Sequence, residues 1–446
     1  MKLVSHPASR PLAGSVRVPG DKSIGHRALL FSLLSETPVR VRGMGDGADN
    51  GRSAKAIAQL GATIAKAPSE PGAIVIRGVG LTGMHAPASP IDCGNSGTTI
   101  RLLCGLLAGQ KFATTLVGDA SLSSRPMLRV IEPLRAMGAV IAGKPKGDDI
   151  TPPLSISAAD RLCAIDRALE MASAQVKTAL VLAGLYADGE TRITEPGPSR
   201  DHSERMLAYL GAPIRTSGRT VSVDTRGWNR KLAGASFTVP ADPSSSAFLV
   251  AAAVIAGADE VRLPGVCVNP TRIGFLDAIA AMGGHVELAD RDDSGPEPIA
   301  TLVIRGAARE LEAIDIAGDL AVRSIDELPV LAVVAARAKG TTHIRDASEL
   351  RVKESDRIAT TCAMLRALGV DCEIRPDGFS IEGRPDRPFT AAHVHADADH
   401  RIAMAAAIAA LVADGPVEID DADNVATSYP GFATALTALG GNVVSA

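Results

Sequence analysis

The sequence predicts an α/β protein of two similar domains, each holding three repeated units around buried helices. Three observations predict this fold. The chain has 446 residues, which exceeds the size at which one hydrophobic core keeps growing. One helical ending, an apolar periodic segment that stops at a glycine before a strand-like pair, occurs six times at intervals of 71 to 86 residues. One strongly apolar segment, which we interpret as a buried helix followed by a strand, also occurs once in each unit.

The composition restricts the possible functions. Hydrophobic residues make up 46% of the chain and aromatic residues only 3%, which suits packed α/β layers and not an aromatic nucleic-acid groove. The net charge of −4 gives no global attraction for DNA or anionic membranes, so an anion would need a local pocket. The longest apolar runs, near residues 247–258 and 402–413, are shorter than the ~20 residues of a membrane span. With no signal-peptide pattern at its start, the chain is expected to be soluble and cytoplasmic.

The six cysteines have irregular spacings and form no C-x-x-C motif. This pattern predicts reduced thiols in a cytoplasmic enzyme rather than a framework of disulfides.

Each of the six helical endings stops at a glycine, which accepts left-handed backbone angles without a Cβ penalty. The six glycines are Gly61, Gly138, Gly211, Gly283, Gly369 and Gly440.

The six segments interpreted as buried helices are apolar on all sides, as a helix inside a core must be. With their following strands they span 22–41, 95–109, 173–193, 244–263, 326–344 and 399–419. Pro240 and Pro243 interrupt the pattern between the third and fourth units, so the domain boundary is expected there.

The starts of these helices carry unusual residues. A helix N-terminus presents free N–H groups and a positive dipole end, so it favours phosphate or carboxylate. If the helices run parallel within each domain, their starts face one interdomain cleft. Ordinary N-capping explains Ser244 and Asp399. It does not explain cations near a positive helix end. These are Lys22, Arg27, Arg101 and Arg401.

Several motifs admit other interpretations. The segment GDKSIGHRALL places Lys22, Ser23 and Arg27 at a helix start, which is an anion site or a solvated helix start, but it lacks the Walker P-loop spacing. The segment CGNSGTTIR is not a nucleophile elbow, because Thr98 occupies the place of the last glycine. The arginine of SSRPM, Arg125, is by itself only weak evidence for a binding site.

The segment HVHADADHR, residues 393–401, carries an H-x-H pattern that can chelate zinc. No further His or Cys cluster is paired with it, so the favoured interpretation is that Arg401 binds a carboxylate or phosphate. No metal is expected.

The segment ELRVKESDR, residues 349–357, concentrates charges at what reads as a helix start. A solvated first turn is the simple interpretation. The alternative is functional: Lys353 and Arg357 are four apart on one helical face and clamp an anion, while Glu354 beside them moves a proton.

Taken together, GDKSIGHRALL, CGNSGTTIRLL, GDASLSSRPM, ASAQVKTALVLAGL, DELPVLAV, LRVKESDR and DHRIAM resemble, in this order, the 5-enolpyruvylshikimate-3-phosphate synthase (EPSP synthase) family. The resemblance runs from about residue 5 to residue 440. The phrases ASAQVK, RDHSERML and PADPSSSAF are similar to the second bacterial class of this family. The resemblance implies an enolpyruvyl transferase-like fold of two domains with three βαβαββ units each, expected at residues 21–240 and at residues 1–20 plus 241–446.

The resemblance also implies an activity: transfer of the enolpyruvyl group of phosphoenolpyruvate to the 5-hydroxyl of shikimate 3-phosphate, with release of phosphate, in aromatic amino acid biosynthesis. It implies two small-molecule substrates clamped between the domains, no cofactor and no metal, and no nucleic-acid or membrane partner. A monomer is expected.

The resemblance assigns roles to residues at matching positions. The implied catalytic residues are Asp326, Glu354 and Lys22. The residues implied to bind shikimate 3-phosphate are Lys22, Ser23, Arg27, Ser173, Gln175, Arg200, Asp326 and Lys353. The residues implied to bind phosphoenolpyruvate are Lys22, Asn95, Gly97, Arg125, Gln175, Arg357 and Arg401. Asp326 accepts the hydroxyl proton, and Glu354 and Lys22 serve proton transfer at the methylene carbon.

Two positions depart from the family pattern. Thr427 stands where some members carry a lysine that helps to bind phosphoenolpyruvate, and Glu349 stands where some carry Asn. Gly97 predicts inhibition by glyphosate, because tolerant members of the second class carry Ala there.

Two alternatives compete with this interpretation. The sister enzyme that transfers enolpyruvate to UDP-N-acetylglucosamine shares the fold, but it carries a loop cysteine as acid, and Cys163 lies in no comparable loop. A non-catalytic anion-binding protein would not need carboxylates such as Asp326 and Glu354 beside its anion.

Overall fold

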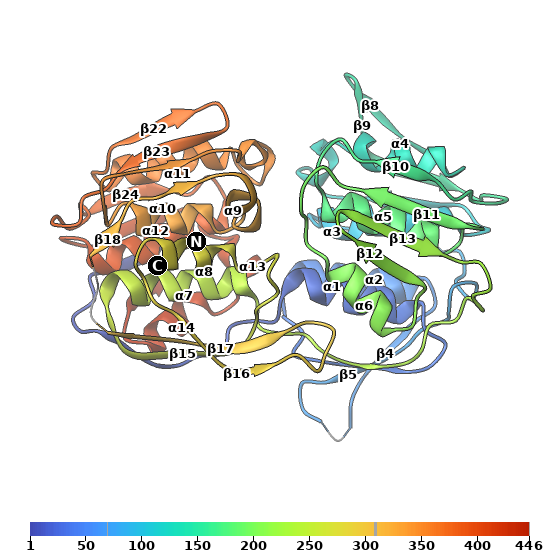
Figure 1. Ribbon diagram of the computed structural model, residues 1–446, viewed down its shortest axis with the longest axis horizontal. Helices are drawn as coiled ribbons and strands as arrows, with labels where there is room; N and C mark the ends of the chain where they lie inside the picture. The colour runs from blue at the N-terminus through green and yellow to red at the C-terminus, as the bar shows by residue number, and fades with distance from the viewer. Residues whose placement is uncertain (69, 307–309, 446) are drawn as a thin grey trace. The chain divides into compact units, whose positions relative to one another are not determined.

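The computed structural model describes residues 1–68, 70–306 and 310–445. Contacts divide the chain into two compact units. The N-terminal unit comprises Gly20–Val239 with Gly295–Glu297, and the C-terminal unit comprises Met1–Pro19, Pro240–Ser294 and Pro298–Ala446. Figure 1 labels the helices and strands of both units.

Three four-stranded sheets of one design form the N-terminal unit. In each sheet the first two strands are parallel, and the third and fourth each pair antiparallel with their neighbour. The strands, in spatial order, are β14 (Ser236–Thr238), β3 (Val39–Arg42), β5 (Ile74–Arg77) and β4 (Thr63–Lys66); then β6 (Ile91–Asp92), β7 (Thr114–Val117), β9 (Asp149–Ser157) and β8 (Val140–Lys146); then β10 (Asp166–Ala168), β11 (Glu190–Thr194), β13 (Thr220–Asp224) and β12 (Ile214–Ser217).

The C-terminal unit repeats this design three times. Its sheets are β2 (Leu12–Ser15), β15 (Ala258–Cys267), β17 (Ile299–Gly306) and β16 (Glu287–Asp292); then β19 (Asp315–Ile316), β21 (Thr341–Ile344), β23 (Gly378–Glu382) and β22 (Cys372–Arg375); then β24 (Ala392–His395), β25 (Val417–Asp420), β1 (Leu3–His6) and β26 (Asn442–Ser445). A further short parallel pair joins β18 (Leu311–Glu312) to β20 (Ala338–Lys339).

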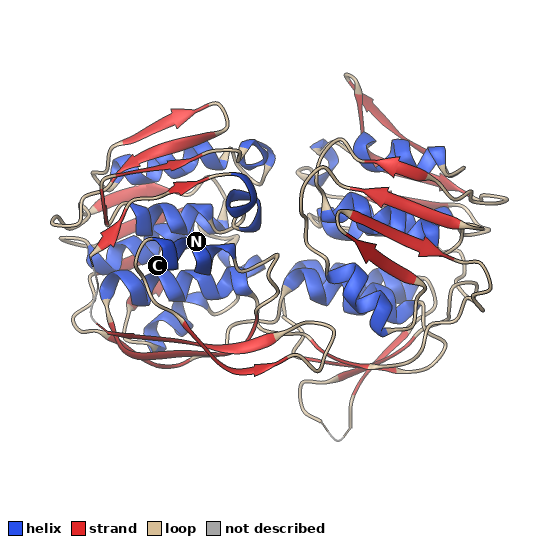
Figure 2. Cartoon of the chain, in the orientation of Figure 1, coloured by secondary structure: helices blue, strands red, loops and turns tan. Residues whose placement is uncertain are grey.

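The six predicted buried helices are confirmed, and in each unit they lie inside while the sheets lie outside (Figure 2). These helices are buried because they have almost no polar face to turn toward water. In the longest of the six, every described residue except the last is buried. The helices are α1 (Lys22–Leu33), α3 (Gly97–Ala108), α5 (Ala174–Gly184), α7 (Pro243–Ala256), α10 (Leu328–Ala335) and α12 (His400–Ala409).

The second helix of each repeat ends as predicted, because all six glycines have a positive φ, between 81° and 113°. A side chain is disfavoured in that backbone region, so glycine sets each helix end. These helices are α2 (Ala48–Gln59), α4 (Leu128–Ala136), α6 (His202–Tyr209), α8 (Gly274–Ala281), α11 (Arg357–Ala367) and α14 (Phe432–Ala438). The remaining helical turns are α9 (Gly318–Arg323), α13 (Val425–Ser428), η1 (Leu122–Ser124), η2 (Ser348–Val352) and η3 (Ala410–Val412).

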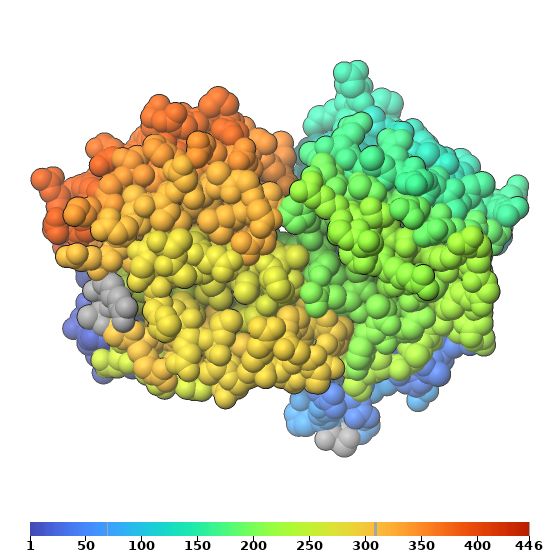
Figure 3. Space-filling model, in the orientation of Figure 1, coloured from blue at the N-terminus to red at the C-terminus, as the bar shows by residue number. Residues whose placement is uncertain are grey.

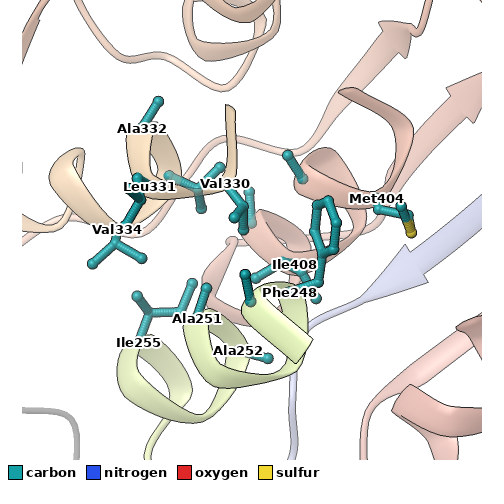
Figure 4. Close-up of a cluster of buried hydrophobic side chains, with 14 of the residues drawn as sticks. Phe248, Ala251, Ala252, Ile255, Val330, Leu331, Ala332, Val334, Met404 and Ile408 are labelled. Carbon is teal, nitrogen blue, oxygen red and sulfur yellow. The ribbon is translucent and has the colours of Figure 1, made fainter. Parts of the chain in front are cut away.

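The core of the C-terminal unit shows how three buried helices pack (Figure 4). Phe248 of α7 lies beside Ile408 of α12, and Ile255 of α7 lies near Val334 of α10. Alanines between them, such as Ala251, let the helix backbones approach closely. The rigid packing fixes the starts of these helices, which carry the charged residues described below.

The cysteine prediction is wrong for one pair. Cys362 of α11 and Cys372 of β22 form a disulfide, with their Cα atoms 5.4 Å apart. The helix turns back at Gly369 into the strand, and this turn brings the two side chains together. Cys93 and Cys104 are buried, and burial raises the pKa of the Cys104 thiol to about 12.

In the N-terminal unit the hairpin of β8 and β9 projects from the surface (Figure 3). No helix in the described part of the chain combines the length and apolar character that crossing a membrane requires.

Candidate active site

Three capped helix starts organise the charged residues of the N-terminal unit. Asp21 caps α1 by accepting the N–H of Ile24 at 2.8 Å, and Ser96 caps α3 by accepting the N–H of Thr99 at 3.1 Å. Ser173 caps α5, although its bond is longer, at 3.5 Å. These caps satisfy part of each helix start and leave further backbone N–H groups at the positive dipole end.

Lys22 and Arg27 occupy different environments although both belong to α1. The Lys22 ammonium lies 3.3 Å from Asp49, and its side chain is 35% exposed. Arg27 is buried: its guanidinium donates to Ser203 Oγ at 2.7 Å, to Thr178 Oγ1 at 3.1 Å and to the carbonyl of Ser23 at 3.0 Å. Burial lowers the pKa of Arg27 to about 10. Arg27 thus supports the start of α1 through Ser23 and is itself held by protein atoms.

The predicted residues Asn95, Arg125 and Gln175 lie around the start of α3. Arg125 donates to the Asn95 side-chain oxygen, and Gln175 donates to Thr98 Oγ1 at 3.0 Å. Arg101 joins them, because its guanidinium donates to Gln175 Oε1 at 2.9 Å and to the carbonyl of Pro126 at 3.2 Å. The sequence marked Arg101 as a cation near a helix start but gave it no partner.

Gly97 fits closely among these arginines. A Cβ added to Gly97 would lie 2.7 Å from one terminal nitrogen of Arg101 and 3.3 Å from one of Arg125. Since Arg101 is buried and hydrogen-bonded, it has little room to withdraw. The position therefore requires glycine for this arrangement.

A buried polar chain ties α1, α2 and α3 together. His26 Nδ1 is bonded to Ser53 Oγ at 2.8 Å, Ser53 to Thr99 Oγ1 at 2.9 Å, and Thr99 donates to Ser96 Oγ at 2.8 Å. Burial lowers the pKa of His26 to about 3, so the ring is neutral at pH 7.

A second cluster forms in the C-terminal unit around Asp326. Its carboxylate lies 3.6 Å from the Lys353 ammonium, 3.5 Å from the Arg357 guanidinium and 3.9 Å from that of Arg401. Arg401 also donates to the backbone carbonyl of Asp326 at 2.6 Å. One acid and three cations that the sequence predicted as site residues are thus neighbours.

Arg357 is 1% exposed and binds two further carboxylates. It donates to Asp399 from Nε at 2.7 Å and to Glu354 from a terminal nitrogen at 2.6 Å. Burial alone would lower the pKa of Arg357, but the neighbouring carboxylates outweigh burial and raise it. Arg357 therefore remains charged.

The expected helical geometry of Lys353 and Glu354 is wrong. Helix α11 begins at Arg357, and Lys353 and Glu354 precede it in an irregular segment after η2. The cause is Asp356, whose carboxylate accepts the N–H groups of Ile358 and Ala359. Asp356 is therefore the N-cap, and Arg357 is the first residue of the helix. Even so, Lys353 reaches Asp326.

The assignment of Ser244 as a cap is also wrong. Asp242 caps α7 by accepting the N–H of Ser244 at 2.8 Å, with Pro243 in the first turn. The Ser244 hydroxyl instead donates to Glu327, a buried acid that lies 3.8 Å from Arg401. Glu327 directly precedes α10, and no role was predicted for it from the sequence. Asp399, by contrast, caps α12 as expected.

Three other positions are placed as follows. Arg200 lies between β11 and α6, near enough to Arg27 to lower its pKa. Glu349 on η2 is 3.3 Å from the Lys353 ammonium, and Thr427 lies on α13.

The metal alternative gains no support from the site around His393 and His395. His393 pairs with Asp420 at 2.5 Å and His395 with Asp397 at 3.4 Å. Among residues 1–68, 70–306 and 310–445, no group of three or more His, Cys, Asp or Glu side chains is arranged to hold a metal.

Comparison with known proteins identifies the family. The sequence profile described as EPSP synthase (3-phosphoshikimate 1-carboxyvinyltransferase) matches residues 7–436. The chain belongs to the EPSP synthase family. The 3-phosphoshikimate 1-carboxyvinyltransferase of Alkalilimnicola ehrlichii is 49% identical over 94% of this chain and 92% of its own length. That of Coxiella burnetii is 46% identical over 98% of this chain and 96% of its own length.

Solved structures agree with the family and the fold. An EPSP synthase from Acinetobacter baumannii superimposes with a TM-score of 0.89 at 40% identity, covering 99% of both chains. The enolpyruvyl transferase NikO from Streptomyces tendae has a TM-score of 0.77 at 18% identity, covering 99% of this chain and 98% of its own, which shows a shared fold alone. The predicted α/β enolpyruvyl transferase-like fold and family are thus confirmed.

Proposed function

We propose that this protein transfers the enolpyruvyl group of phosphoenolpyruvate to the 5-hydroxyl of shikimate 3-phosphate and releases phosphate. The observation that carries the proposal is Asp326, a carboxylate within 3.9 Å of three cationic side chains. Cations bind two anionic substrates, and a carboxylate among them accepts a proton. The EPSP synthase family supplies the reaction in which both are needed.

Residues of both units are assigned to the substrates. For shikimate 3-phosphate we propose the group Lys22, Ser23, Arg27, Ser173, Gln175, Arg200, Asp326 and Lys353. For phosphoenolpyruvate we propose the group Lys22, Asn95, Gly97, Arg125, Gln175, Arg357 and Arg401. Arginine suits these ligands because its planar fork binds carboxylate and phosphate through two bonds.

The reaction balances with acids and bases of the chain. In the addition step the 5-hydroxyl oxygen bonds to C2 of phosphoenolpyruvate, Asp326 takes the hydroxyl proton, and C3 gains a proton. In the elimination step C3 loses a proton, the bond from C2 to the phosphate oxygen breaks, and phosphate leaves. Glu354 and Lys22 serve the proton transfers at C3. Exclusion of water would preserve the tetrahedral intermediate between the steps.

Arg357 adds a requirement to this mechanism. Its Nε and one terminal nitrogen already donate to Asp399 and Glu354. The other terminal nitrogen lies 3.5 Å from Asp326, the proposed base. A phosphoenolpyruvate oxygen bound there would lie beside both proposed catalytic carboxylates.

We further propose that the protein acts as a cytoplasmic monomer with domains at residues 21–240 and at residues 1–20 plus 241–446. In support of the domain bounds, contacts group residues 1–19 with the C-terminal half of the chain. Light scattering on the eluted peak of a gel-filtration column should give a mass near 45.8 kDa.

The deciding experiment is a phosphate-release assay on the purified protein with phosphoenolpyruvate and one of two acceptors. Shikimate 3-phosphate should support release, and UDP-N-acetylglucosamine should not. Release with the second acceptor alone would assign the protein to the sister reaction, and release with neither would refute the proposed function.

A further inference from the structure

A buried lysine with two buried carboxylates lies beneath the proposed shikimate 3-phosphate residues of the N-terminal unit. The Lys177 ammonium is 2.7 Å from Glu195 and 2.7 Å from Glu204. All three side chains are at most 6% exposed. The proposed mechanism uses none of them, and they come from α5, the loop after β11, and α6.

Lys177 is charged despite its burial. Burial by itself lowers the pKa of Lys177, but Glu204 and Glu195 outweigh burial and raise it. The lysine is therefore an ammonium at pH 7. Its neighbours along α5, such as Val176 and Leu180, are apolar and buried, so an apolar residue at 177 would suit the helix itself. A buried ion pair seldom stabilises a fold more than well-packed apolar residues do, so stability alone does not account for this lysine.

The cluster reaches the proposed ligand residues through Glu195. One oxygen of Glu195 accepts the backbone N–H of Ser173 at 3.1 Å, and the other accepts the hydroxyl of Ser199 at 2.9 Å. Ser173 is the cap of α5, and Ser199 directly precedes Arg200. Lys177 holds Glu195 between these two segments. Glu195 in turn fixes the positions of Ser173 and Arg200.

The cluster also reaches Arg27 through α6. Glu204 follows Ser203, whose hydroxyl accepts a bond from Arg27 at 2.7 Å and is bonded to Thr178 Oγ1 at 2.6 Å. Thr178 in turn follows Lys177 on α5. The ion pair between Lys177 and Glu204 therefore holds together the two helices that carry the partners of Arg27.

We propose that Lys177 is a positioning residue for shikimate 3-phosphate, acting through Glu195 on Ser173 and Arg200. This inference rests on the proposed function. Its physical basis is preorganisation: side chains already fixed in the bound geometry lose less entropy when the ligand binds.

The test compares two matched variants, Glu195→Gln and Glu204→Gln. Each removes one carboxylate from Lys177 and leaves the other. In Glu195→Gln the amide oxygen turns to Lys177, so its NH₂ group faces the Ser173 N–H, which loses its acceptor. We expect the KM for shikimate 3-phosphate to rise about tenfold, as for loss of a buried hydrogen bond. The KM for phosphoenolpyruvate and kcat should stay within about twofold of wild type.

Glu204→Gln is the control for charge and burial. In the described part of the chain, Glu204 makes no hydrogen bond to Ser173 or Ser199. We expect its Tm to fall about as far as that of Glu195→Gln, with a change in KM for shikimate 3-phosphate of less than about threefold. Equal KM values in the two variants would overturn the positioning role and leave a structural ion pair.

Ser199→Ala gives a second measurement if Glu195→Gln does not fold. It removes one bond to Glu195 without disturbing the buried charges, and its KM for shikimate 3-phosphate should rise about threefold. An unchanged KM would contradict the proposal. Wild-type protein in the same assay separates a failure of the proposed function from a failure of the positioning role. An inactive wild type refutes the proposed function. An active wild type whose variants have unchanged KM values refutes the positioning role alone.

Discussion

Arg357 donates from its Nε to Asp399 at 2.7 Å, and both side chains are at most 1% exposed. The pair joins the first residue of α11 to the cap of α12, because Asp399 also accepts the N–H of Arg401. Two helix starts that carry proposed phosphoenolpyruvate residues are therefore held by one buried ion pair. Removing one partner would leave a buried charge in a site of low dielectric.

Replacing Asp399 with Ala should destabilise the protein by about 3 kcal/mol, the order of magnitude for breaking a buried pair. The loss includes the cap of α12. The measurement is the free energy of unfolding of the variant and the wild type in urea.

Glu349→Ala is the matched control. Glu349 also pairs with a cation, Lys353 at 3.3 Å, but its side chain is 47% exposed. Such an exposed pair should contribute less than about 1 kcal/mol. An equal loss of stability in both variants would mean that burial does not determine the strength of the Arg357 pair.

Asp326→Asn should lower kcat by at least about 100-fold, the usual contribution of a positioned general base. Asn keeps the size of the side chain but cannot accept the hydroxyl proton. The assay is phosphate release at saturating substrates, with the Tm recorded in parallel. Because Lys353, Arg357 and Arg401 each have a further carboxylate partner, we expect the Tm to change little. A variant with wild-type turnover would remove the role assigned to Asp326.

Gly97→Ala should raise the KM for phosphoenolpyruvate about tenfold, because the new methyl group would lie 2.7 Å from Arg101. Arg101 would have to release Gln175 or Pro126, and Arg125 would be pushed as well. Steady-state kinetics with varied phosphoenolpyruvate would measure the change.

Glyphosate gives an independent measurement at the same position. The wild type should be inhibited at micromolar concentrations, and Gly97→Ala should need much higher concentrations for the same inhibition. A wild-type rate that is unchanged by micromolar glyphosate would contradict the prediction.

The parts of the fold that the sequence predicted are those set by local physics. Gly211 ends its helix because glycine tolerates φ of 83°, and this can be read from the residue itself. The N-terminal strands were different. Leu3 of β1 pairs with Ile419 and with Ser445, and no pattern near residue 3 names partners so distant in the chain. The disulfide between Cys362 and Cys372 likewise depends on a helix-to-strand turn, and not on a spacing typical of disulfides.

The candidate site likewise has parts that the sequence predicted and parts that it did not. The spacing paired Lys353 with Arg357, and the resemblance to the EPSP synthase family added Asp326 to the same site. In the structure Lys353 lies 3.6 Å and Arg357 3.5 Å from Asp326. The start of α11 was predicted too early, because Asp356 caps this helix by accepting the N–H of Ile358. Lys177 was missed as well: in the sequence it stands in an apolar helix, and its partner Glu195 follows 18 residues later in a loop.

Acid should destabilise the protein through its buried neutral histidines. The folded-state pKa of His26 is lowered to about 3 by burial, whereas an unfolded histidine titrates near 6.5. Below pH 6.5 the unfolded state therefore binds more protons, so the contribution to stability that is complete above pH 6.5 is lost as the pH falls toward 3. The expected loss is about 1.4 kcal/mol per pH unit for each such histidine. Burial lowers the pKa of His400 to about 3 as well, so it should contribute in the same direction.

His26→Asn tests this prediction by comparing how much stability the variant and the wild type each lose when the pH is lowered. Unfolding free energies of the wild type and the variant would be measured at pH 7.5 and pH 5.0. The drop between these pH values should be about 2 kcal/mol smaller in the variant, because a titrating group has been removed. The charged groups around the ring, Asp49, Lys22, Arg27 and Asp21, remain in both proteins. His395→Asn is the control, since its side chain is 63% exposed and its replacement should leave the drop at the wild-type value. An equal drop in wild type and His26→Asn would show that His26 is not the group that acid must protonate during unfolding.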